Sequence, residues 1–185
     1  VGAQEPTERF RRALGDHFVE CRVFVDAGKS LTSLVDSAAG RVHEDWLASL
    51  AEDIAQLHKE KRDILVVSSG AIATAIPFLD LPTRPTDLAT QQAAAAVGQN
   101  VLMWRYQTSL DRHNIIAGQI LLTAGDMEHP THRTNAQRAL ERLLGLRILP
   151  IVNENDTVAT AEIRFGDNDR LAAMVAVLVR ADALV

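Results

Sequence analysis

Residues 64–71 have the sequence Ile-Leu-Val-Val-Ser-Ser-Gly-Ala, in which four apolar side chains are followed directly by small and polar ones. A continuously apolar strand is typical of a parallel sheet that is covered on both faces. Serine and glycine at a turn into a helix leave backbone N–H groups that bind carboxylates or phosphates, although tight packing of strand on helix explains the same residues. The segment therefore predicts a central parallel strand with a candidate anion site at its carboxyl end.

The rest of the chain alternates short strands with longer helices. Strands separated by helices imply a mainly parallel sheet with helices on both faces, which is a three-layer αβα sandwich. Residues 183–185 look like the opening of another buried strand, so we expect the chain to be part of a longer protein. The predicted strands span 22–26, 115–122 and 146–152, and the predicted helices span 44–59, 88–112, 133–144 with a stop at Gly145, and 167–180.

The composition of the 185 residues restricts the classes of function. The chain has 19 Lys and Arg against 24 Asp and Glu, a net charge of −5, whereas nucleic-acid binding needs clustered positive charge. No apolar run approaches the roughly 18–20 residues that span a bilayer, and residues 1–12 lack the apolar stretch of a secretory signal. Cys21 has no second cysteine with which to form a disulfide. We therefore expect a cytoplasmic protein that binds a small molecule, and neither nucleic acid nor membrane.

A second polar segment, Asp26-Ala-Gly-Lys-Ser30, follows the first predicted strand. Gly28 would let a ligand approach the backbone, and Lys29 would neutralise a phosphate. A turn that ends the strand and carries a solvated lysine is the alternative interpretation. The segment lacks the upstream glycine of a Walker loop, which excludes a P-loop ATPase.

The densest polar cluster follows the strand predicted at 146–152, in residues 153–157 and 165–169. A carboxamide can donate to a substrate carboxylate and accept from its ammonium group, while a carboxylate can bind an ammonium group, hold a lysine or coordinate magnesium. Two Asx-turns and a helix cap are the alternative explanation. The six histidines are scattered without metal-ligand spacing, so we interpret them as surface residues and expect no metal held by the protein alone.

Several segments carry a resemblance to a known family: Val66-Val-Ser-Ser-Gly-Ala-Ile-Ala73, Gln91-Gln-Ala-Ala-Ala-Ala-Val-Gly-Gln99, Leu121-Leu-Thr123, Thr134-Asn-Ala-Gln137, and Ile151-Val-Asn-Glu-Asn-Asp-Thr-Val-Ala-Thr160 with Arg164-Phe-Gly-Asp-Asn-Asp169. In this order and spacing they resemble the glutamate 5-kinases, the γ-glutamyl kinases of proline biosynthesis in the amino acid kinase superfamily. The resemblance runs from about residue 47 to residue 185. It implies that residues 21–185 form the N-terminal, glutamate-binding portion of an amino acid kinase domain, and that residues 1–20 are an N-terminal extension.

The resemblance also implies an activity, which is the ATP-dependent phosphorylation of the γ-carboxylate of L-glutamate to γ-glutamyl phosphate. The nucleotide would carry Mg²⁺, proline would act as a feedback inhibitor at the glutamate site, and the protein would be a homodimer or homotetramer. Asp169 resembles the carboxylate that orients the catalytic lysines, and Gly70 and Ala71 would offer backbone N–H groups to the phosphate or substrate. The residues that resemble those holding glutamate are Ser69, Asp156 and Asn168, with Asn153 a weaker candidate.

The sequence departs from the family pattern at its first strand. That strand ends in Lys-x-Gly in the family, and the lysine contacts the transferring phosphate, whereas Asp26 stands before Ala27 and Gly28 here. Lys29 is the expected replacement. The family's nucleotide-binding half would begin beyond residue 185, so we expect this chain to carry the acceptor side of the site. A non-catalytic protein that binds glutamate or proline is the alternative, and a different carboxylate kinase on the same fold is a third reading.

Overall fold

The computed structural model describes residues 22–26, 35–36, 41–81, 83, 85–158 and 168–184. Within this part of the chain, parallel strands form a five-stranded sheet in the order β5-β6-β4-β1-β7. A separate antiparallel pair joins β2 (Val35–Asp36) to β3 (Arg41–Val42). The strands of the main sheet are β1 (Arg22–Asp26), β4 (Asp63–Val67), β5 (Ala117–Leu122), β6 (Leu149–Glu154) and β7 (Ala183–Leu184).

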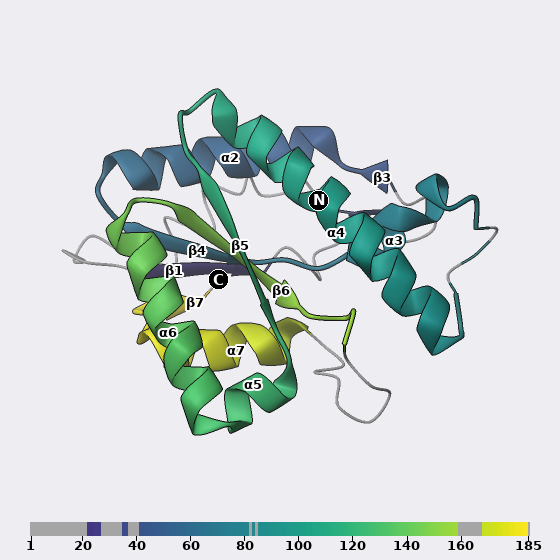
Figure 1. Ribbon diagram of the computed structural model, residues 1–185. Helices are drawn as coiled ribbons and strands as arrows, with labels where there is room; N and C mark the ends of the chain where they lie inside the picture. The colour runs from purple at the N-terminus through teal and green to yellow at the C-terminus, as the bar shows by residue number, and fades with distance from the viewer. Residues whose placement is uncertain are drawn as a thin grey trace, which may run out of the picture.

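Helices cover both faces of this sheet (Figure 1), which confirms the predicted three-layer αβα sandwich. One layer holds α2 (Glu44–Lys59), α3 (Ala71–Ala75) and α4 (Leu88–Asp111), with the 3₁₀ turn η1 (Ile76–Phe78) after α3. The other layer holds α5 (Ala124–Glu128), α6 (Pro130–Gly145) and α7 (Asn168–Val179).

Strand β4 lies between the two halves of the core. Ile64 and Val66 pack in the cluster that includes α2 and α4, whereas Leu65 and Val67 pack in the cluster formed with α5, α6 and α7. Because successive side chains of a strand point to opposite faces, a strand buried on both faces must be apolar throughout. The interpretation of residues 64–67 as a central strand is therefore confirmed.

Helix ends follow local chemistry. Helix α2 begins at Glu44 as predicted, with Glu44 and Asp45 in its first turn and Lys59 in its last, which complements the helix dipole. Helix α4 begins after Asp87, whose carboxylate accepts a hydrogen bond from the Thr90 N–H at 2.8 Å. This hydrogen bond lowers the pKa of Asp87 below its usual 3.8.

Several predicted boundaries are wrong by a few residues. Helix α6 begins at Pro130 rather than at residue 133, because a proline lacks the N–H that the first turn does not need. Gly145 is the last residue of that helix, but the left-handed residue that turns the chain is Arg147, with φ 60°. Because residues 146–148 form the turn, β6 begins at Leu149 instead of at residue 146, and it runs to Glu154.

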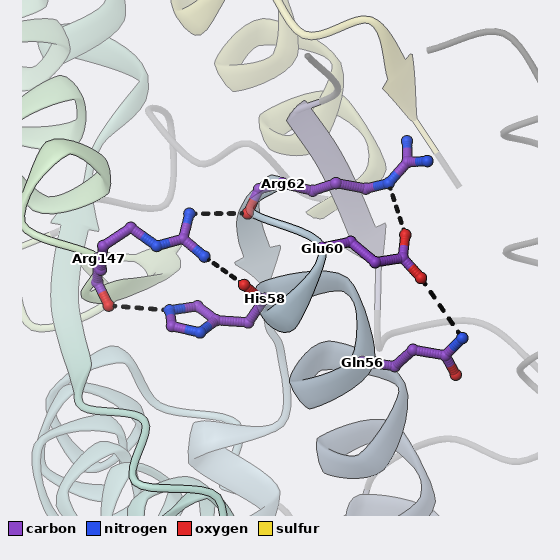
Figure 2. Close-up of polar contacts among 5 residues, drawn as sticks. All are labelled: Gln56, His58, Glu60, Arg62 and Arg147. Carbon is purple, nitrogen blue, oxygen red and sulfur yellow. Dashed lines mark hydrogen bonds and ion pairs between the residues drawn. The ribbon is translucent and has the colours of Figure 1, made fainter. Parts of the chain in front are cut away.

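At the amino-terminal edge of the sheet, Arg147 ties the end of α2 to the start of β6. Its guanidinium donates hydrogen bonds to the carbonyl oxygens of His58 at 2.6 Å and Arg62 at 3.1 Å, and the His58 ring lies 3.2 Å from the Arg147 carbonyl oxygen (Figure 2). Glu60 joins Gln56 and Arg62 beside this turn (Figure 2). The half-buried His58 is therefore not the surface residue that we expected, and these contacts satisfy carbonyls at the helix end.

None of the helices in the described part of the chain combines the length and the apolar character needed to cross a bilayer.

Candidate functional site

The carboxyl ends of β1, β4 and β6 lie side by side. Val67, the last residue of β4, pairs with Asp26 at the end of β1 and with Val152 of β6. The Ser68 N–H continues the ladder and donates to the Val152 carbonyl oxygen at 2.8 Å. The polar residues that follow these strands are thus brought to one edge of the sheet, which is where open α/β sheets bind ligands.

The turn after β4 is built from residues that sequence analysis selected. Gly70 is the N-cap of α3 and has φ 95°, a left-handed conformation that disfavours any residue with a Cβ. Its carbonyl oxygen accepts two hydrogen bonds at 2.9 Å, from the N–H and from the hydroxyl group of Thr74. Ser69 and Gly70 are half-buried, and Ala71 is buried. The backbone of this turn is therefore held in one conformation.

Helix α4 packs directly onto this turn. A Cβ added at Gly98 would lie 1.7 Å from the Ala71 carbonyl oxygen, so the two backbones approach as closely as only glycine allows. Tyr106, also on α4 and 1% exposed, donates a hydrogen bond from its hydroxyl group to Ser68 Oγ at 3.1 Å. The helix thus fixes both ends of the segment that links β4 to α3.

A chain of side-chain amides connects α4 to the start of α7. Asn153 Nδ2 donates to Gln99 Oε1 at 2.8 Å, and Asn153 Oδ1 accepts from the Glu154 N–H at 2.8 Å. Asn168 Nδ2 donates to Asn153 Oδ1 at 3.2 Å and to the Ser68 carbonyl oxygen at 2.6 Å. The structure therefore brings Asn153 and Asn168 together beside the turn of β4.

Asn155 makes local contacts just beyond the end of β6. Its Oδ1 accepts from the Thr157 hydroxyl group at 2.5 Å, and its N–H donates to the Leu122 carbonyl oxygen at 2.8 Å. Its carbonyl oxygen accepts from the Val158 N–H at 3.3 Å, and its own N–H extends the ladder between β5 and β6, so Asn155 has a structural role and lies apart from the amide chain. Asp156, one residue further, is half-buried.

The remaining predicted site residues are Asp169, Gly28, Lys29 and Asp26. Asp169 lies in the first turn of α7, exposed and next to Asn168, where a negative charge complements the helix dipole. Gly28 and Lys29 lie outside the described residues. For Asp26 the backbone is described, and its pairing with Val67 puts it at the same edge of the sheet.

A carboxylate follows the neighbouring strand β5 at the same edge. Asp126 and Thr123 form a capping box, in which Asp126 Oδ2 accepts from the Thr123 N–H at 2.8 Å and from its hydroxyl group at 2.7 Å. Asp126 Oδ1 lies 2.9 Å from His132 Nδ1. Burial raises the pKa of Asp126, but the hydrogen bonds from Thr123 and the contact with His132 outweigh it and hold the pKa below the usual 3.8. In the described part of the chain, no three His, Cys, Asp or Glu side chains gather as a metal site would require.

Gln99 is the last residue of the motif at 91–99, and no role was predicted for it. Gln99 falls in line with Ala95, Leu102 and Tyr106, which are spaced by three or four residues and are all buried. A glutamine in the buried stripe of a helix needs a hydrogen-bond partner, and that is the signal that could have found it.

Val97 and Trp104 are large apolar residues of α4. Val97 is 37% exposed and Trp104 is 58% exposed, so they are not part of the core. The buried face of α4 is formed by Leu102, Tyr106 and Leu110 instead.

Among solved structures, the fold is similar to that of T. acidophilum isopentenyl phosphate kinase in a product complex. The TM-score is 0.57 at 11% sequence identity, over 88% of this chain and 67% of that one. At this identity the likeness shows the fold alone.

Among curated proteins, the chain is similar to several named glutamate 5-kinase. It is 63% identical to that of Leifsonia xyli subsp. xyli over 89% of this chain and 58% of the relative, and 63% identical to that of Clavibacter michiganensis subsp. michiganensis over 89% and 61%. It is 50% identical to that of Streptomyces coelicolor over 95% of this chain and 45% of the relative. The chain thus spans about three fifths or less of the length of these relatives. Residues 28–185 match the amino acid kinase family, and the chain therefore belongs to that family.

Proposed function

We propose that this chain carries the glutamate-binding part of a glutamate 5-kinase, which uses ATP to convert L-glutamate to γ-glutamyl phosphate in the first step of proline biosynthesis. The proposal is supported by the 63% identity to proteins of that name and by the polar groups collected at the carboxyl edge of the sheet. The single observation that carries it is the amide of Asn168 held against Ser68, because this joins the two segments expected to hold the substrate.

The amino-acid end of glutamate requires groups of both kinds. Its ammonium group needs acceptors, which the Asp156 carboxylate and the Asn168 amide oxygen supply, and its α-carboxylate needs donors such as the Ser69 hydroxyl group. Asn153 is buried and bonded to its neighbours, so its role is to support Asn168 more than to touch substrate.

The reaction transfers a phosphoryl group between two anions. A γ-carboxylate oxygen forms a bond to the γ-phosphorus of ATP, the bond from that phosphorus to its bridging oxygen breaks, and ADP leaves with the electron pair. The protein's task is to position both anions and to neutralise charge. In this proposal the N–H groups of Gly70 and Ala71 meet the reacting groups, and Gly28 lets the nucleotide approach. Lys29 neutralises the phosphate, and Asp169 orients the lysines.

ATP supplies the phosphoryl group and carries Mg²⁺ into the site. The residues of this chain that would meet the nucleotide, Gly28 and Lys29, are outside the described residues, so the geometry above concerns the glutamate side. Proline would bind where glutamate binds and so compete with it. The protein would work in the cytoplasm as a homodimer or homotetramer.

One observation favours a second candidate, a protein that binds glutamate or proline without catalysis. The register of β1 and β4 puts Asp26 at the carboxyl edge, at the position where the resembled family has a lysine. A carboxylate there would repel the transferring phosphate instead of attracting it.

Two measurements on the protein in its full natural length separate these candidates. Calorimetry with L-glutamate tests binding, and L-aspartate, which is one methylene shorter, is the matched control ligand. Incubation with glutamate, ATP, Mg²⁺ and hydroxylamine traps γ-glutamyl phosphate as the hydroxamate. The kinase proposal expects both binding and hydroxamate, whereas binding with no hydroxamate would favour the second candidate. Absence of both results would contradict the two together.

A further inference from the structure

The amides of Gln99, Asn153 and Asn168 have one defined orientation each. The Glu154 N–H can only donate, so the Asn153 atom that it meets at 2.8 Å is Oδ1, and Nδ2 faces Gln99. The Ser68 carbonyl can only accept, so the Asn168 atom 2.6 Å from it is Nδ2. Backbone groups thus fix the Asn153 amide in the middle of the row and the Asn168 amide at one end, while at the other end Gln99 meets the row through the acceptor that it presents to Asn153 Nδ2.

The orientation of the Asn168 amide decides which of its atoms can meet a ligand. Within the described part of the chain, both of its side-chain hydrogen bonds use Nδ2, one to Ser68 and one to Asn153. The atom left to meet a ligand is Oδ1, which is an acceptor. An acceptor at this position suits an ammonium group and disfavours a second carboxylate.

Gln99 is the residue at the buried end of this row of three amides. It is only 7% exposed, and Asn153 is 2% exposed. Because its Oε1 is occupied by Asn153 Nδ2, its Nε2 points elsewhere, and among the described residues this Nε2 has no acceptor. A buried donor without a partner is costly, so a fold that keeps one gains something from the orientation of that side chain.

We propose that Gln99 is a positioning residue for the amino-acid site: by accepting from Asn153 Nδ2, it anchors the Asn153 amide with Oδ1 turned toward Asn168 Nδ2, and this supports the orientation in which Asn168 Oδ1 meets the ammonium group of the substrate. The inference rests on the proposed function, since it assumes that the ligand is an α-amino acid. Gln99 does not touch the reacting atoms. It acts through Asn153, whose Nδ2 would otherwise be a buried donor without a partner, and whose amide would be held only through Oδ1, by the Glu154 N–H and Asn168 Nδ2.

The test compares two ligands that differ only in the ammonium group, L-glutamate and glutarate. Dissociation constants are measured by calorimetry, directly for L-glutamate and by displacement for glutarate, on the full-length protein. The variant Gln99→Met keeps the length of the side chain but removes the acceptor. We expect it to reduce the preference for L-glutamate over glutarate by about tenfold, since a hydrogen bond to a charged group is lost or misdirected.

Gln107→Met is the matched control. Gln107 lies on the same helix and also bonds backbone groups, the Ala117 N–H at 2.9 Å and the Ile115 carbonyl oxygen at 3.1 Å, but it is not part of the amide chain. This variant is expected to lower the melting temperature while leaving the ratio of the two dissociation constants unchanged.

Gln99→Glu decides the matter if Gln99→Met does not fold. A carboxyl group at this position still accepts from Asn153 Nδ2, in its neutral form as in its charged one, so we expect the preference for L-glutamate to be kept. The inference is overturned if Gln99→Met weakens both ligands equally, or if Gln99→Glu loses the preference. A parent protein that binds neither ligand overturns the proposed function and the inference with it, and is recognised by the parent result alone.

Discussion

Asn168 Nδ2 lies 2.6 Å from the carbonyl oxygen of Ser68, although 100 positions separate the two residues in the sequence. The contact joins the first turn of α7 to the end of β4. It also places one residue of each segment that resembles the glutamate-binding residues of a kinase at the same edge of the sheet.

Replacement of Asn168 by alanine tests this contact. Asn168→Ala removes both the donor to Ser68 and the acceptor offered to substrate, so we expect L-glutamate binding to weaken at least about tenfold. Calorimetry measures the change. Asn100→Ala, at an exposed position of α4, is the control and should bind like the parent. Equal affinities in all three proteins would remove Asn168 from the site.

Asp156 is expected to be the negative group that the substrate ammonium meets. Asp156→Ala should abolish measurable glutamate binding, and Asp156→Asn, which keeps the shape and loses the charge, should weaken it strongly. Titration of both variants with L-glutamate gives the comparison. If Asp156→Asn binds as tightly as the parent, the charge is not needed and the assignment fails.

Asp26 distinguishes the kinase from the non-catalytic binder. In the full-length protein, Asp26→Lys restores a positive charge at the end of β1 and is expected to raise hydroxamate formation. Asp26→Asn, which only removes the negative charge, is the matched variant and should give a smaller gain. No gain, or a loss, with Asp26→Lys would show that Lys29 already serves or that Asp26 has its own task.

Two helical glycines test the packing of α4 against α3: Gly98 lies in α4 at the contact, and Gly145 lies in α6 and is the control. The Cβ of Gly98→Ala would meet the Ala71 carbonyl oxygen, which is backbone and moves only with α3, so we expect a loss of about 3 kcal/mol or failure to fold. Gly145→Ala, with nothing within 4 Å of its Cβ, should instead stabilise α6 by about 0.5–1 kcal/mol. Urea unfolding of both variants measures the free energies. Similar values for the two would contradict the close approach of α4 to α3.

Asp126 gives the protein a predicted dependence on pH. Its pKa in the folded protein is below the usual 3.8, so the unfolded chain takes up the proton first. The stabilisation is therefore complete above about pH 4 and is lost as the pH falls through the lowered pKa. Unfolding measured between pH 5 and pH 2 should show a steeper loss in the parent than in Asp126→Asn. Parallel curves for the two proteins would mean that the negative charge of Asp126 adds no stability to the folded protein.

Local patterns in the sequence were enough to predict the framework of the fold. The apolar run of β4, the stripe of α2 and the alternation of strands and helices depend on neighbours in the chain, and the three-layer sandwich follows from them. The helix that follows the Ser-Gly turn was expected but its extent was not, and α5 was missed, because five residues are too few to show a period.

The candidate site was predicted less completely. Asn153 and Asn168 were selected by their residue types and by the family resemblance, and the structure joins them. The place of Gln99 depends on how α4 lies across the end of β6, a long-range contact that no local pattern contains. The distinction between Asn155 and Asn153 has the same origin, since both are asparagines of one strand end and only their partners separate them.

A crystal structure of the protein grown with L-glutamate tests the central claim most directly. The account predicts the amino acid at the carboxyl ends of β4 and β6, with its ammonium group within hydrogen-bond distance of Asn168 Oδ1 and its α-carboxylate near the Ser69 hydroxyl group. Glutamate bound at any other edge of the sheet, with Asn168 and Ser69 untouched, would contradict it.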